Sequence, residues 1–192
     1  MRILVMGDST AVGAGGTPEE SIAGRLGADF PQAIIVNDSK NGQKLEGFLA
    51  ALRAHREEKY DLIVFQIGAN DIVGLTSEAS IRKNLLTALT YANDMASHTI
   101  ILSAGNIGLA PVFKWPLSVF YSSRSYAVRS LYQEEIKKYP QMRYIDLYHD
   151  RAHEPFNTDV DRFYAADHFH PSGAGYGIWY AQIREALSSL LG

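Results

Sequence analysis

The sequence predicts an α/β protein, a three-layer α/β/α sandwich on a five-stranded parallel sheet, with residues 1–192 forming one domain. Two observations predict this class. Short apolar, β-branched runs recur five times along the chain, and segments with apolar residues at helical spacing lie between them. Strands that alternate with helices pair in parallel, and right-handed crossovers place the helices on both faces of the sheet.

The strands are expected where the apolar runs lie, because each run is followed by a cluster of glycine, asparagine or aspartate that ends it. These runs occupy residues 2–6, 33–37, 62–67, 99–104 and 142–147. The chain is 46% hydrophobic and no long linker divides it, so one core is expected for all five strands.

The first expected helix has the clearest start signal. Thr17 offers an N-cap, Pro18 a first-turn proline and Glu20 the returning carboxylate of a capping box, ahead of an apolar face that includes Leu26. Apolar stripes predict three later helices, and a weaker pattern predicts a fourth. The stripes lie at residues 45–52, 81–92 and 176–190, and the weaker pattern at 124–138.

The longest segment without clear periodicity, residues 105–123, is expected to be a functional loop. It holds four aromatic side chains, Phe113, Trp115, Phe120 and Tyr121. Such side chains either fill the core over the sheet edge or bind an acyl group, so a lid and a packing role both stay open.

Composition and charge exclude several classes of function. A net charge of −3 without a basic block argues against nucleic acid as a partner. The absence of cysteine excludes disulfides, a thiol nucleophile and thiolate metal sites. No stretch approaches the roughly 20 apolar residues of a membrane-spanning helix, so no stable membrane insertion is expected. The first apolar run is too short for a signal-peptide core, which favours a cytoplasmic location and leaves export with a removed leader as the alternative.

Four polar clusters are expected at or near one edge of the sheet. They are residues 7–10 after the first strand, 41–42 shortly after the second, 68–71 after the third, and 167–171 before the last helix. In open parallel sheets, ligands bind beyond the carboxyl ends of the strands. The fold would therefore gather a serine, an asparagine and an Asp-x-x-His pair at the place where a ligand binds.

The same four clusters resemble the motif blocks of the SGNH hydrolases, the GDSL-like lipases and acylhydrolases, and they occur in that family's order. The resemblance runs from residue 7 to residue 171, and its one departure is Thr10, where the name-giving motif has leucine. It implies a flavodoxin-like arrangement of five parallel strands. It also implies a serine esterase that acts on small-molecule acyl esters and needs no cofactor.

Carried over position by position, the resemblance implies Ser9 as nucleophile, His170 as general base and then acid, and Asp167 as the carboxylate that orients the imidazole. It assigns the oxyanion hole to the backbone N–H groups of Ser9 and Gly42 and to the side-chain amide of Asn70. These roles agree with the chemistry, because a serine hydroxyl needs an adjacent base, and that base needs a partner that fixes its tautomer. The developing oxyanion needs donors aimed at it.

Each of these residues also has a simpler interpretation. Ser9 could be a helix cap or turn residue, and Gly42 a turn glycine that no substrate approaches. Asp71 is expected to cap the helix after the third strand, and Asn70 could share that role. The catalytic interpretation therefore depends on all four clusters together.

Other partners for the histidines also stay open. Asp8 or Asp161 could orient His170 in place of Asp167, which could instead be a cap. His168 and His170, with Asp167, could contribute to a metal site, although the sequence indicates no second cluster that would complete it.

The alternative function is a flavodoxin-like nucleotide- or phosphate-binding module without hydrolase activity. It is suggested by the glycine-rich residues 7–16 after the first strand, which could cradle a phosphate. That segment has neither a Gly-Lys-Ser/Thr ending nor a G-x-G-x-x-G pattern. An ordinary α/β-hydrolase is disfavoured too, because residues 7–11 lack the final glycine of a nucleophile elbow.

Overall fold

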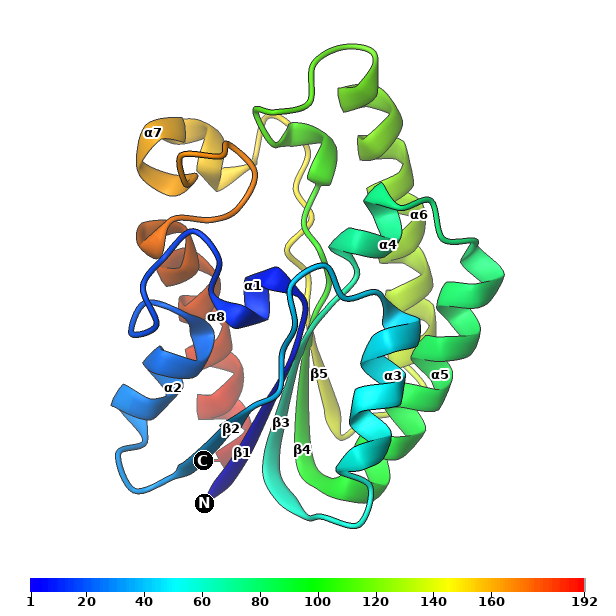
Figure 1. Ribbon diagram of the computed structural model, residues 1–192, viewed down its shortest axis with the longest axis vertical. Helices are drawn as coiled ribbons and strands as arrows, with labels where there is room; N and C mark the ends of the chain where they lie inside the picture. Colours follow the sequence, from blue (N-terminus) through cyan, green and yellow to red (C-terminus); the bar gives the residue numbers. More distant parts are fainter. Residues whose placement is uncertain (192) are drawn as a thin grey trace.

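The computed structural model describes residues 1–191 and confirms the α/β sandwich. Five strands form one parallel sheet in the order β2-β1-β3-β4-β5 (Figure 1). They overlap the five apolar runs and comprise β1 (Arg2–Gly7), β2 (Ile34–Asn37), β3 (Tyr60–Gln66), β4 (Ala96–Leu102) and β5 (Met142–Ile145).

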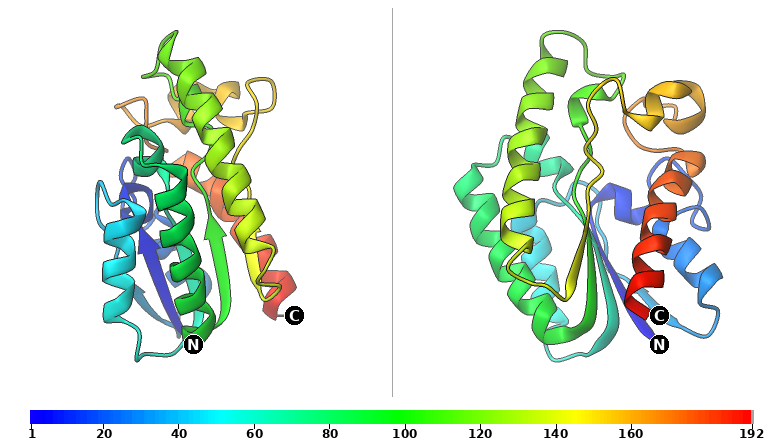
Figure 2. Two further views of the ribbon diagram at one scale, coloured as in Figure 1. Left: turned by 90° about the vertical axis from the view of Figure 1, so that its right-hand side faces the viewer. Right: turned by 180° about the vertical axis from the view of Figure 1, so that it is seen from behind.

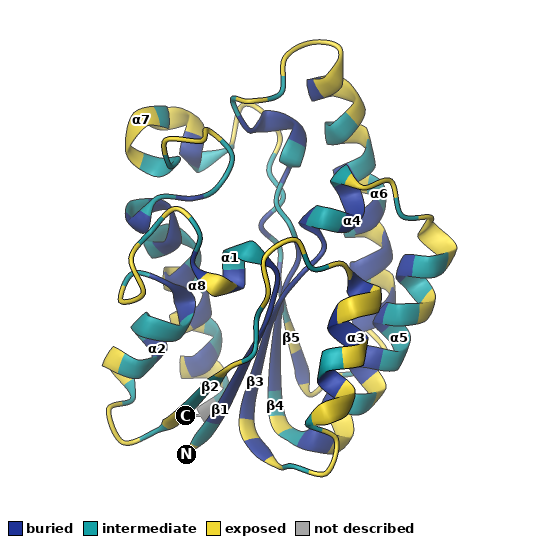
Figure 3. Ribbon diagram, viewed as in Figure 1, coloured by how far each residue is buried: buried dark blue, intermediate teal, exposed yellow. Residues whose placement is uncertain are grey.

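Helices cover both faces of this sheet (Figures 1 and 2). One face carries α3 (Leu45–Ala54), α5 (Glu78–Met95) and α6 (Leu117–Ile136), and the other carries α2 (Ile22–Asp29) and α8 (Gly173–Leu191). Strand side chains alternate between the two layers, so Ile63 and Phe65 join one buried cluster whereas Leu62 and Val64 join the other. The central strands are consequently buried on both sides (Figure 3). No helix among residues 1–191 is long and apolar enough to cross a membrane.

The start of the first long helix differs from the prediction. α2 begins at Ile22, and its N-cap is Ser21, whose hydroxyl accepts the N–H of Gly24 at 3.1 Å. Thr17 does form the expected bond to Glu20, N–H to Oε2 at 3.0 Å, but it closes a turn ahead of the helix. The sequence holds two capping signals, and the second of them starts the helix.

The expected loop over residues 105–123 is only partly a loop. Residues 107–109 form the short helix η1 (Ile107–Leu109), and α6 begins at Leu117, seven residues before the predicted helix. The prediction of a loop was therefore wrong for residues 107–109 and 117–123. Four further short helices were not predicted: α1 (Ser9–Val12), α4 (Ala69–Val73), η2 (Pro155–Thr158) and α7 (Val160–Phe163).

The strand order places a topological switch point beside β1. β2 pairs with β1 on one side and β3 pairs with it on the other, so the chain segments that follow these strands diverge. Such a divergence at the carboxyl edge of a parallel sheet opens a crevice where ligands bind.

Candidate active site

Ser9 lies at this switch point, at the first position of α1. Asp8 caps the helix, and its Oδ1 accepts both the N–H of Thr10 at 3.0 Å and the Thr10 hydroxyl at 2.8 Å. The threonine that departs from the family motif thus fixes the capping carboxylate. Only a glycine fits at position 7, just before Asp8, because a Cβ on Gly7 would lie 1.9 Å from the carbonyl oxygen of Gln66 on β3.

The structure brings Ser9, His170 and Asp167 into one hydrogen-bonded chain. His170 Nε2 lies 2.9 Å from Ser9 Oγ, and His170 Nδ1 lies 2.5 Å from Asp167 Oδ2. Ser9 and His170 are 161 residues apart in sequence, so only the fold joins them. Because one nitrogen faces the hydroxyl and the other faces the carboxylate, the imidazole is held in the orientation that a general base requires.

Asp167 both caps its own turn and contacts the histidine. Its Oδ1 accepts the N–H groups of Phe169 and His170, each at 2.9 Å, which leaves Oδ2 for the imidazole. Burial alone would raise the pKa of Asp167, but the hydrogen bonds from His170 and Phe169 outweigh it and lower the pKa below its usual value. The carboxylate is therefore charged at neutral pH.

Neither alternative acid occupies this position. Asp8 is turned toward Thr10, and burial raises its pKa despite the bonds from Thr10. Asp161 is exposed on α7, and no hydrogen bond or ion pair joins it to His170 in the described part of the chain.

The proposed oxyanion donors come from the start of α1, the loop after β2 and the start of α4. Within residues 1–191 the backbone N–H groups of Ser9 and Gly42 have no acceptor. For Ser9 this is usual, because it is the first residue of α1. Gly42 adopts φ +71°, and open space surrounds the position of a Cβ. Asn70 donates Nδ2 to the carbonyl oxygen of Gln43 at 3.2 Å, which ties it to the Gly42 loop and leaves its second Nδ2 hydrogen for another acceptor.

Asp71 has a different partner from the one predicted. The N-cap of α4 is Gly68, which makes no side-chain cap, so neither Asn70 nor Asp71 caps that helix. Asp71 is instead buried, and its Oδ2 accepts the N–H of Leu45, the first residue of α3, at 2.9 Å. The prediction that Asp71 caps the helix after β3 was therefore wrong, and its carboxylate instead accepts an N–H at the start of α3, whose N-cap is Lys44.

His168 stands apart from the hydrogen-bonded chain. It is exposed, adopts φ +54°, and its carbonyl oxygen accepts the N–H of Val112 at 3.3 Å. Across the described residues, no three histidine, aspartate or glutamate side chains gather in a group that could hold a metal ion.

Gly15 is a site residue that sequence reasoning missed. At φ +92°, it lets the segment that carries His170 approach closely. A Cβ at Gly15 would lie 2.4 Å from the carbonyl oxygen of Pro171, 2.8 Å from Ala165 Cβ and 3.1 Å from His170 Cβ. The glycine-rich segment after β1 thus serves as a packing surface for the histidine loop.

We expect Gly15→Ala to lower both activity and stability. An alanine at positive φ is strained by about 1–2 kcal/mol, and the clash must push the histidine loop away. Because a displacement of about 1 Å can cost about a hundredfold in rate, kcat/KM should fall about tenfold or more. Gly27→Ala is the matched control, since a Cβ there meets nothing within 4 Å and alanine favours the α2 helix. Equal activity in the two variants would contradict the packing role.

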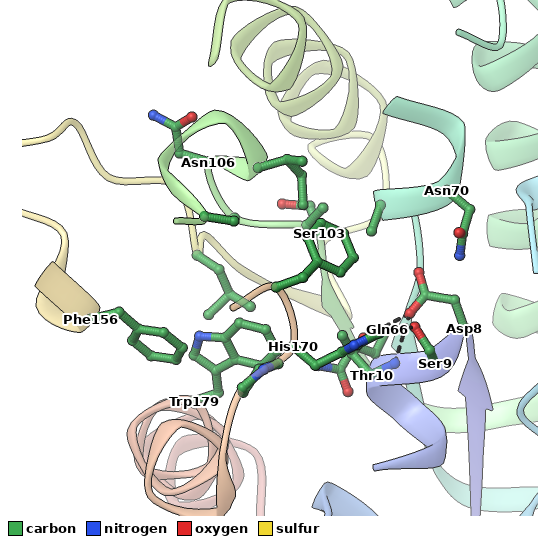
Figure 4. A pocket seen from close by; sticks show the side chains of 18 of the residues that line it. Asp8, Ser9, Thr10, Gln66, Asn70, Ser103, Asn106, Phe156, His170 and Trp179 are labelled. Atoms are coloured by element: carbon green, nitrogen blue, oxygen red, sulfur yellow. Dashed lines mark hydrogen bonds between the residues drawn. The ribbon is translucent and has the colours of Figure 1, made fainter. Parts of the chain in front are cut away.

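A cavity of about 70 Å³ opens beside Ser9 and His170 (Figure 4). In the figure, Ser9 and Asp8 lie at one end and Phe156 and Trp179 at the other. These two rings stack, with centroids 5.8 Å apart and planes 19° from parallel. The cavity wall also includes Gln66, Ser103, Leu147, Glu154, Tyr164 and Phe169. The aromatic residues of the predicted loop contribute only indirectly, because Phe113 packs against Phe169 at 5.9 Å whereas Trp115 is 81% exposed.

Solved structures share this architecture. The crystal structure of TesA aligns with a TM-score of 0.72 at 23% identity and covers 99% of both chains. A member of the lipolytic protein G-D-S-L family from Veillonella parvula aligns at 0.71 and 18% identity, covering 98% of both chains. The psychrotrophic esterase EstA from Pseudoalteromonas sp. aligns at 0.72 and 16% identity, covering 99% of this chain and 98% of its own. At these identities the likeness shows the fold.

The sequence comparisons settle the family. No curated protein matches the chain significantly. The GDSL-like Lipase/Acylhydrolase family, in contrast, matches residues 5–178, a span that includes every polar cluster at the carboxyl edge of the sheet. The chain therefore belongs to the GDSL-like lipase/acylhydrolase family of hydrolases.

Proposed function

We propose that the protein is a serine esterase whose nucleophile is Ser9. The observation that carries this proposal is the hydrogen-bonded chain from Asp167 through His170 to Ser9, which ends at the mouth of a cavity. Such a chain supplies a nucleophile, a base and an orienting carboxylate, the three groups that acyl transfer needs. No metal or organic cofactor takes part in the proposed steps.

In the first step, Ser9 Oγ attacks the acyl carbon of the ester while His170 Nε2 takes the serine proton. The carbonyl oxygen becomes an oxyanion, which accepts hydrogen bonds from the N–H groups of Ser9 and Gly42 and from Asn70 Nδ2. The bond between the acyl carbon and the alcohol oxygen then breaks, and His170 gives its proton to that oxygen. Asp167 stabilises the imidazolium that exists between the two proton transfers.

In the second step, a water molecule replaces the alcohol. His170 Nε2 takes a proton from the water as its oxygen attacks the acyl carbon, and the bond to Ser9 Oγ breaks as the proton returns to the serine. The products are a carboxylic acid and the free enzyme, so atoms and charge balance over the two steps.

We expect a fluorophosphonate to modify Ser9 covalently, in one-to-one amount and with complete loss of esterase activity. Phosphorus mimics the attacked acyl carbon, so the reaction needs the same activated hydroxyl. The esterase EstA, which shares this fold, was itself crystallised inhibited by monoethylphosphonate. Intact mass and peptide mapping would locate the adduct. An adduct on another serine, or none while esters are still cleaved, would remove Ser9 from the mechanism.

The alternative nucleotide-binding module receives no support from the glycine-rich segment. Gly13 packs on Ser21, and Gly15 packs on Pro171 and Ala165, so protein atoms occupy the space beside these glycines. A purified protein free of flavin or nucleotide absorbance that cleaves p-nitrophenyl acetate would decide for the esterase.

A further inference from the structure

The side-chain amide of Gln66, the last residue of β3, is buried without a hydrogen-bond partner. Gln66 is 3% exposed, and neither Nε2 nor Oε1 has a partner among residues 1–191. It lines the cavity, and Figure 4 shows it beside Ser9 and His170. Unpaired buried amides are rare in folded proteins, because the lost hydrogen bonds to water are not replaced. The amide is therefore placed to pair with a group that enters the cavity.

A second hydrogen-bonding group borders the same space. Glu154 is half-buried, and its Oε1 accepts the N–H of Phe156 at 3.2 Å. The rest of the cavity wall is mostly apolar and includes Leu147, Phe156 and Trp179. An apolar cavity with a few fixed polar groups binds ligands that carry matching polar groups, whereas a bare alkyl chain would leave those groups unpaired.

The size of the cavity limits what can enter. At roughly 10–15 Å³ for each water-sized group, 70 Å³ accommodates about five to seven non-hydrogen atoms. A long fatty acyl chain would extend beyond the cavity into its open mouth. During turnover the acyl group stays on Ser9 while the alcohol leaves and water enters, so a cavity that begins at Ser9 suits the acyl part better than the alcohol part.

We propose that the cavity selects short acyl groups, of about five to seven non-hydrogen atoms, that carry a hydroxyl or amide near the acyl carbon, and that Gln66 pairs with that group. The proposal rests on the esterase function above, because Ser9 must carry the acyl group. It makes Gln66 a specificity-determining residue.

The test compares p-nitrophenyl 3-hydroxybutyrate with p-nitrophenyl butyrate, in the parent protein and in Gln66→Met. The parent should favour the hydroxylated ester about tenfold in kcat/KM, the effect of one hydrogen bond to a buried amide. In Gln66→Met, which keeps the length of the side chain, the ratio of the two kcat/KM values should fall to the ratio of the uncatalysed rates or below it. Gln66→Glu retains an acceptor oxygen and should keep part of the preference.

Thermal stability distinguishes this role from a merely structural one, because replacing a structural glutamine would lower the melting temperature. Gln66→Met removes an unpaired buried amide, so its melting temperature should equal or exceed that of the parent while the preference is lost. The matched control is Gln141→Met, at an exposed glutamine outside the cavity, which should leave the substrate ratio unchanged.

Three results would overturn the proposal. The first is an equal substrate ratio in the parent and in Gln66→Met, and the second is faster turnover of the palmitate ester than of the butyrate ester. The third is a Gln66-dependent preference for a hydroxyl that appears only when the hydroxyl is in the alcohol part of the ester. The last is measured with 2-hydroxyethyl butyrate against ethyl butyrate. If the fluorophosphonate labels Ser9 and the protein cleaves p-nitrophenyl acetate, any of these three results rejects only the proposed acyl selectivity. If neither occurs, the esterase function fails as well.

Discussion

His170→Asn is expected to lower kcat/KM by about four orders of magnitude, whereas His168→Asn should retain most of the activity. His170 Nε2 is the nitrogen that faces Ser9 Oγ, at 2.9 Å, so its removal leaves the hydroxyl without a base. His168 is exposed and, within residues 1–191, forms a hydrogen bond with none of the three residues of the proposed triad. Asparagine is chosen for both because it tolerates the left-handed backbone of His168, at φ +54°.

Steady-state kinetics on p-nitrophenyl acetate would measure both variants, and circular dichroism would show that both fold. Asp167→Asn should lie between them, because an imidazole without its carboxylate keeps some basicity but is poorly held. Activity of the parent should be insensitive to chelators. A comparable loss in both histidine variants, reversed by added zinc, would favour a metal site over the triad.

The sheet could be predicted from sequence because its signal is local. Each strand is a short β-branched run with a turn cluster behind it, and burial on both faces makes such runs continuous. Helix starts were harder, since Thr17 and Ser21 both carry capping chemistry and only tertiary packing decides between them. The first two turns of α6 show no apolar stripe in the sequence. Several of their large apolar side chains, such as Val119 and Phe120, are exposed, so the apolar residues there do not mark one buried face.

The residues of the candidate site likewise divide into those that the sequence could predict and those that it could not. Ser9 and Asn70 could be proposed because each is a reactive or polar residue in a short motif at a strand end, and Asp167 and His170 because they form a short motif before the last helix. Gly15 could not, since its role depends on a loop about 150 residues later that packs against it.

Gln66 escaped notice for a related reason. A glutamine at the end of a buried strand is unremarkable in sequence, and only the fold shows that its amide is unpaired beside a cavity. The limits of the cavity depend likewise on Phe156 and Trp179, which come from η2 and α8.

Asn70→Ala is expected to lower kcat by about a hundredfold or more and to change KM much less. An oxyanion donor acts mainly where charge develops, so its loss affects the transition state more than the bound substrate. The structure adds a second contribution, because Asn70 Nδ2 also donates to Gln43, the neighbour of Gly42. Its removal would loosen the loop that presents the Gly42 N–H as well as remove the amide itself.

A structural role alone would give a different result, and a matched variant measures it. Asn37 also donates Nδ2 to a backbone carbonyl, that of Ala11, at the same 3.2 Å, and it does not line the cavity. Asn37→Ala should therefore lose about 1 kcal/mol of stability while kcat stays within a few-fold of the parent. Asn70→Ala should show a similar shift in melting temperature together with the large loss of kcat. If both variants lost only stability, Asn70 would be a residue that positions the Gly42 loop, and the oxyanion would depend on the backbone N–H groups of Ser9 and Gly42.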